Sequence, residues 1–184
     1  MSEETSASAE SSLQTRVKVL APEDVSGQVL GELLEDAVID FRLISDERLY
    51  VSGGLACPMW IDLVPDLQLI RLNNYVELNP EVPEEDYFKF ANKLNASGYF
   101  PSFHVYKQRM YADLVIHYRD GLIARQFVRW CRLYSSEMVS WLNRFQAEQA
   151  QTMKQTTGDS GPELFIFPWH QSQEPADASP VMLN

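Results

Sequence analysis

Hydrophobic residues recur at helical spacing in three segments of the chain. These segments run from about residue 22 to 37, from 83 to 97 and from 123 to 150. In the last segment the apolar side chains fall within one sector when projected at about 100° per residue. We therefore predict three helices that each bury one face, and the last of them is long and strongly amphipathic.

Between the predicted helices the hydrophobic pattern changes to a period of two. Apolar and polar residues alternate from 39 to 51, after which Gly53 and Gly54 interrupt the pattern, and strand-rich sequence continues from 59 to 78. This spacing predicts three or four antiparallel strands.

A second hairpin is expected over residues 103 to 118. With Gln108 and Arg109 as its two turn residues, His104 lies opposite Asp113, and Tyr106 lies opposite Tyr111. The apolar residues of the two strands then share one face, while the histidine and the tyrosines share the other.

The order of these elements is helix, three or four strands, helix, two strands, helix. It predicts an α+β fold: a two-layer sandwich in which an antiparallel sheet carries the helices on one face. The domain is expected to span residues 15–151. Residues 1–14 have the composition of a disordered tail, and residues 152–184 read as a flexible tail with an apolar island at 164–169.

Charge and composition narrow the classes of function. The chain has 184 residues and a net charge of −11, which argues against nucleic-acid binding because phosphate contacts need clustered cations. We see no apolar run long enough to span a bilayer, and the acidic start does not resemble a signal peptide. Two cysteines make neither a disulfide framework nor a four-ligand zinc site. We expect a cytoplasmic protein that binds no membrane.

The order of elements resembles that of the YbjN-domain proteins, a family of proposed bacterial sensory transduction regulators. Its fold is similar to that of class I type III secretion chaperones. The resemblance covers roughly residues 22 to 148. It rests on the segments Val29–Asp36, Met59–Leu63, Ala91–Ser97, Phe103–Tyr106 and Met110–Leu114. It implies regulation or chaperoning through protein contacts, with no catalytic residue and no cofactor.

Titratable residues on the hairpin offer a second interpretation. His104 beside Asp113, with His117 farther along, could begin a catalytic site, and the same residues together with Asp62 or Asp40 could hold a metal. The sequence supplies no placed nucleophile and no tight ligand spacing. We therefore predict no enzyme and no metal.

Three sets of residues are candidates for binding a protein partner. The first is an aromatic row on the uncovered sheet face, formed by Trp60, Tyr106 and Tyr111. The second is the apolar tail, with Phe165, Phe167 and Trp169, for which docking on the edge of its own sheet or on that of a second copy is an equal alternative. The third is a basic stripe on the last helix, formed by Arg125, Arg129 and Arg132. Solvent exposure of a helix face also explains the stripe.

Two hypotheses follow from the sequence. The first is a non-enzymatic domain that regulates or chaperones other polypeptides, and we expect it to be a homodimer. The alternative is a small-ligand binder or an uncharacterised enzyme that uses His104, Asp113 and His117. A pocket around these three residues would favour the alternative.

Overall fold

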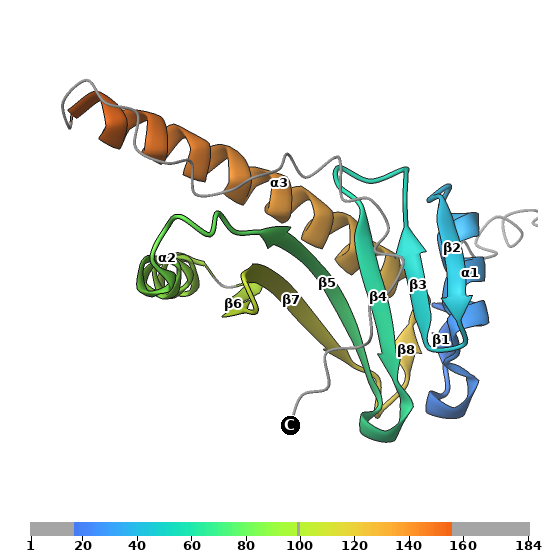
Figure 1. Ribbon diagram of the computed structural model, residues 1–184. Coiled ribbons are helices and arrows are strands. Elements are labelled where there is room, and N and C mark those ends of the chain that lie inside the picture. Colours follow the sequence, from blue (N-terminus) through green and yellow to red (C-terminus); the bar gives the residue numbers. More distant parts are fainter. Residues whose placement is uncertain (1–16, 99, 156–184) are drawn as a thin grey trace, which may run out of the picture.

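The computed structural model describes residues 17–98 and 100–155. Within these ranges, six antiparallel strands form one sheet in the order β2-β3-β4-β5-β7-β6, and three helices lie beside it (Figure 1). The arrangement confirms the predicted α+β class. None of the described helices is both long and apolar enough to cross a bilayer.

The bounds of the elements are as follows. The strands of the large sheet are β2 (Phe41–Ser45), β3 (Arg48–Val51), β4 (Met59–Val64), β5 (Leu69–Glu77), β6 (Ser102–Tyr106) and β7 (Arg109–His117). The helices are α1 (Gly27–Asp36), α2 (Glu84–Ser97) and α3 (Ala124–Gln155). A two-stranded ribbon pairs β1 (Val19–Leu20) with β8 (Leu122–Ile123), and the short 3-10 turns are η1 (Pro22–Asp24) and η2 (Pro65–Leu67).

Helix α1 begins later than the sequence pattern suggests. Ser26 caps it, because its Oγ accepts a hydrogen bond from the backbone N–H of Val29 at 3.3 Å. Gly27 follows directly, and a Cβ there would lie 2.4 Å from the backbone oxygen of Asp46. The glycine is therefore required by close packing of the helix start against the β2–β3 turn.

The hydrophobic core lies between the sheet and helices α1 and α3, which run along one of its faces (Figure 1). Its largest fully buried side chains come from all three of these elements: Leu30, Leu34, Leu49, Met59, Ile61, Ile70, Leu72, Phe127, Tyr134 and Met138. The buried hydroxyl of Tyr134 donates to the carbonyl oxygen of Ala112 at 2.7 Å. The helix is thereby tied to the backbone of β7 at the centre of the core.

The register of the second hairpin differs from the prediction. Its turn residues are Lys107 and Gln108, with φ of 47° and 55°, so the hairpin closes one residue earlier than expected. Two successive left-handed residues match the twist of the flanking strands. His104 therefore lies opposite Tyr111, and Tyr106 lies opposite Arg109. The strands slip by two residues, an even number, so every side chain keeps its predicted face.

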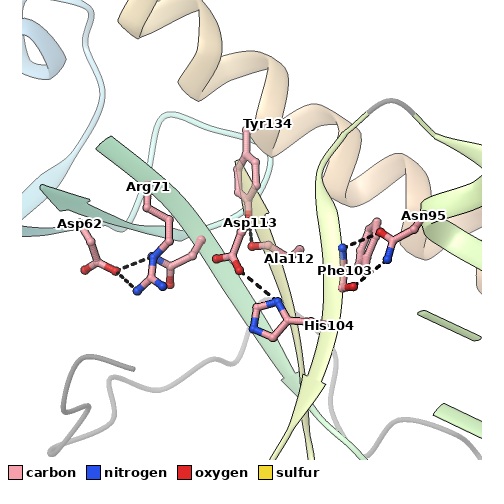
Figure 2. Close-up of polar contacts among 9 residues, drawn as sticks. Asp62, Arg71, Asn95, Phe103, His104, Ala112, Asp113 and Tyr134 are labelled. Carbon is pink, nitrogen blue, oxygen red and sulfur yellow. Dashed lines mark hydrogen bonds and ion pairs between the residues drawn. The ribbon is translucent and has the colours of Figure 1, made fainter. Parts of the chain in front are cut away.

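Helix α2 lies against the end of the sheet at β6 rather than over its face (Figure 1). The side chain of Asn95 makes the contact. Its Oδ1 accepts from the N–H of Phe103, and its Nδ2 donates to the carbonyl of Phe103, both at 2.8 Å (Figure 2). One amide thus satisfies the two backbone groups that a further strand would need. Tyr87, Ala91 and Leu94 of α2 still belong to the hydrophobic core that α1 and α3 cover.

Candidate functional site

The face of the sheet opposite α1 and α3, here called the outer face, carries a row of charged side chains. Asp62 on β4 lies between Arg48 on β3 and Arg71 on β5, because the strand register places the three side by side. Arg71 approaches the Asp62 carboxylate at 2.8 Å (Figure 2). Arg48 approaches it from the other side at 3.1 Å. Asn73 also donates to Asp62, at 2.8 Å. Asp62 is only 7% exposed, and its carboxylate is surrounded by the hydrogen bonds from Arg71 and Asn73 and by the ion pair with Arg48.

Trp60 is not an exposed contact residue, which corrects the sequence prediction. It does lie on the outer face, but it is only 6% exposed. The Arg48 guanidinium carbon lies 4.3 Å from the Trp60 ring centroid, and the Tyr50 ring lies 4.7 Å away. Burial arises here because long side chains on the neighbouring strand fold over the indole. The alternation of a strand predicts which face a side chain lies on, but it does not predict whether side chains of the neighbouring strand cover it.

One exposed part of the outer face lies on β6 and β7. Tyr106 and Val115 are each 45% exposed, and His104 and Tyr111 are partly exposed. The imidazole of His104 stacks on Tyr111, with ring centroids 5.1 Å apart and planes 9° apart. We call these four residues, His104, Tyr106, Tyr111 and Val115, the outer patch. Two of the three aromatics proposed for this face therefore belong to an accessible surface.

The His104–Asp113 pair exists despite the shifted register. Nδ1 of His104 lies 3.1 Å from Oδ2 of Asp113, across a diagonal between the strands (Figure 2). Burial raises the pKa of Asp113, and electrostatic interactions with Arg71 and His104 oppose that rise. His117 lies opposite Leu69, two pleats beyond Asp113, so it does not join the pair.

The described residues do not assemble the catalytic or metal site of the alternative hypothesis. Ser102 lies opposite Asp113 on β6, yet among the described hydrogen bonds none joins it to His104. Asp40 pairs through its backbone with Gly53, in the segment before β2. No group of three or more potential metal-binding side chains occurs in the described part of the chain.

Both cysteines belong to the buried interior. The Oγ of Ser135 on α3 accepts from the N–H of Cys57 at 2.7 Å and donates to the Cys57 carbonyl at 3.1 Å. Burial raises the pKa of the Cys57 thiol, and it raises that of Cys131 strongly. A thiol held protonated is a poor nucleophile. These two residues serve packing.

The basic stripe of α3 lies in a groove. Arg125, Arg129 and Arg132 are all exposed, and they line a cavity of about 480 Å³ together with Val17, Lys18, Leu33, Asp36, Ala37, Ala124 and Val128. Sequence reasoning found the three arginines and missed Lys18. Lys18 could not be found from local sequence, because it lies near the arginines only after β1 pairs with β8.

Some candidate residues lie outside the described part of the chain. They are the tail residues Phe165, Phe167 and Trp169, together with the proposed disordered segment 1–14. Two features of the site were missed by sequence reasoning: the cap that Asn95 places on β6 and the Arg48–Asp62–Arg71 row. Only the strand register could have revealed the second.

Comparison with known proteins addresses the fold. No protein-family model and no curated protein matches the sequence. Among solved structures, the chain is similar to YbjN from E. coli, described as a proposed transcription regulator. The TM-score is 0.54 at 16% sequence identity, and the match covers 66% of this chain and 92% of that one. At this identity the likeness concerns the fold alone, and the chain therefore has a YbjN-like α+β fold.

Proposed function

We propose that the chain is a non-enzymatic interaction domain of a bacterial, cytoplasmic protein that acts by binding another polypeptide in a regulatory or chaperone-like role. The observation that carries the proposal is the outer patch. It combines two half-exposed residues, Tyr106 and Val115, with the stacked rings of His104 and Tyr111. Tyrosine on a rigid surface gives a large contact area at a low cost in conformational entropy.

The neighbouring polar side chains support a fixed surface rather than a reactive one. His104 is held by Asp113 on one side and by the Tyr111 ring on the other. Tyr75 packs against Tyr111 with centroids 5.7 Å apart, and the Arg109 guanidinium carbon lies 4.5 Å from the Tyr75 ring centroid. These contacts restrict the rotamers of the patch before a partner arrives, which lowers the entropy lost on binding.

The β6 edge next to the patch is unsuited to binding by strand addition. Asn95 already occupies the outward N–H and carbonyl of Phe103. A partner peptide that added as a strand would have to displace this amide. We infer that a partner contacts the side chains of the outer patch and not the backbone of β6.

The test is affinity capture of partners from the native host, followed by titration of each purified candidate. A Tyr106→Ser, Val115→Ser double variant removes two apolar side chains from the outer patch. The matched control is Leu67→Ser, Phe88→Ser, which removes two side chains of similar exposure elsewhere. We expect the first variant to weaken a specific partner at least tenfold, about 1.4 kcal/mol, while the control leaves it within twofold. Equal affinity for both variants would refute the outer patch as the binding surface.

A further inference from the structure

The groove between α1, β1 and the first turns of α3 concentrates positive charge on an otherwise acidic chain. Lys18, Arg125, Arg129 and Arg132 line it, and among the described residues of its lining only Asp36 is acidic. Residues 21–100 hold 15 acidic and five basic residues, and the whole chain carries −11. The cations therefore form a local exception to the charge of the molecule.

The fold holds these cations in a defined arrangement. Arg125, Arg129 and Arg132 follow one another at helical spacings of four and three residues, so they share one face of α3. Lys18 is placed beside them because its carbonyl accepts a hydrogen bond from the N–H of Ala124 at 3.0 Å. Arg132 donates to the carbonyl of Ala37 at 3.1 Å, which links α3 to the end of α1.

Two of the arginines remain available to a ligand. Neither Arg125 nor Arg129 forms an ion pair with another residue in the described part of the chain. Helical rise places their Cα atoms about 6 Å apart along the axis. This rise is close to the spacing of about 6.6 Å between alternate residues of an extended peptide. Two carboxylates at positions i and i+2 of such a peptide thus match the two guanidinium groups.

The apolar residues of the groove favour an acidic peptide over a nucleic acid as the anionic ligand. Val17, Leu33, Ala124 and Val128 contribute apolar walls between the cations. A nucleic-acid backbone presents phosphates without apolar side chains, whereas a peptide can supply carboxylates and apolar anchors together. Three arginines spread over about 10 Å of helix also suit a short peptide better than a long polyanion.

We propose that this groove binds an acidic peptide segment of a partner protein, one in which carboxylates alternate with apolar side chains. The groove is separate from the outer patch. The proposal deepens the proposed function and rests on it in one respect, since both require a polypeptide ligand. Guanidinium groups bind the carboxylates bidentately, and the apolar walls hold the intervening side chains.

The experiment measures fluorescence anisotropy of a fluorescein-labelled peptide of alternating glutamate and leucine, titrated with the full chain. Arg129→Glu reverses one groove charge, and Arg119→Glu, an equal charge change at an exposed residue outside the groove lining, is the matched control. We expect Arg129→Glu to weaken binding about tenfold and Arg119→Glu to change it less than twofold. Circular dichroism of both variants confirms that they fold.

Further probes separate the possible occupants and the two surfaces. A glutamine–leucine peptide and a twelve-nucleotide thymidine strand should both bind at least tenfold more weakly than the acidic peptide. Equal binding of either probe would overturn the proposal, as would unchanged affinity in Arg129→Glu. The Tyr106→Ser, Val115→Ser variant should keep its affinity for the acidic peptide. If that variant loses the peptide while Arg129→Glu keeps it, the groove is rejected and the outer patch stands.

Discussion

Val38 adopts a left-handed backbone conformation directly after α1, with φ of 58°. The N–H groups of Val38 and Ile39 donate to the carbonyls of Glu35 and Leu34, both at 2.9 Å, and complete a Schellman motif. Glycine is the usual residue here, because a Cβ clashes with the backbone in this conformation. Val38 is 83% exposed, so little burial compensates for the strain.

We therefore expect Val38→Gly to raise the free energy of unfolding by about 1 kcal/mol. Urea denaturation gives the change from the shift in midpoint at constant slope. Val19→Gly, at an exposed position in β1, serves as the control and should lower stability by about 0.5–1 kcal/mol. A destabilised Val38→Gly variant would show that the valine side chain makes a contact worth more than its strain.

Asp113 should give the stability of the protein a defined pH dependence. Its pKa is raised in the folded state, mainly by burial, so the folded chain holds this proton more tightly than the unfolded chain does. Its contribution to stability therefore falls as the pH rises through the raised pKa. In Asp113→Asn that loss is absent, and the variant should gain stability relative to the natural chain between pH 4 and pH 7. Chemical denaturation of both proteins at pH 4 and at pH 7 measures this difference in unfolding free energy. If Asp113→Asn is less stable relative to the natural chain at pH 7 than at pH 4, the predicted direction is wrong.

Trp60 illustrates the limit of sequence reasoning at this scale. Alternation in Met59–Val64 predicted its face, because a strand has a period of two. Its exposure depended on Arg48 and Tyr50, which lie on another strand and reach it only through the register. The same reasoning succeeded for Tyr106, whose position near the end of an edge strand leaves no such neighbour on one side.

At the scale of elements, the second hairpin shows what a periodic pattern can and cannot specify. The pattern predicted both strands and the face of each residue, and these hold. The turn was placed one residue too late, since Lys107 and Gln108 are not residues that commonly signal a left-handed turn. The start of α3 was predicted to within one residue because its apolar stripe is long and continuous, whereas the helix ends at Gln155, five residues beyond the predicted end.

Asn95 is the side chain by which α2 protects the end of the sheet. Asn95→Ala removes both hydrogen bonds to the backbone of Phe103 and should cost about 1–3 kcal/mol of stability. It should also speed hydrogen exchange at the N–H of Phe103, because that donor loses its acceptor. Asn92→Ala, at an exposed residue of the same helix, is the control. Unchanged exchange at Phe103 in Asn95→Ala would contradict the role given to this amide.

At the scale of the whole molecule, the homodimer stays a prediction, and β2 is the edge at which we place it. It is the outermost strand at the end opposite β6, and its Leu43 and Ile44 are 44% and 48% exposed. In the part of the chain that the structure describes, no strand pairs with the outer side of β2, and an apolar edge strand of this kind favours pairing with a second copy. We expect light scattering to give twice the chain mass of 21.1 kDa, and Ile44→Lys to give the monomer. A mass of 21.1 kDa for the natural chain across a wide concentration range would refute the dimer.

The α+β architecture could be predicted from the sequence because each element carries its own periodicity. The surfaces could not, since they combine residues from distant segments. Lys18 joins the arginines of α3 only through the pairing of β1 with β8. The Arg48–Asp62–Arg71 row likewise needs three strands in register.

The most direct test of the central claim is hydroxyl-radical footprinting of the domain with and without a purified partner. We predict that Tyr106, Tyr111 and Val115 become protected in the complex, because the partner covers the outer patch. Leu67 and Phe88, which are exposed elsewhere on the molecule, should keep their reactivity. Their unchanged oxidation would show that the free and bound samples received the same dose of hydroxyl radicals. Unchanged oxidation of Tyr106, Tyr111 and Val115 in a saturated complex would contradict the claim that this sheet face binds the partner.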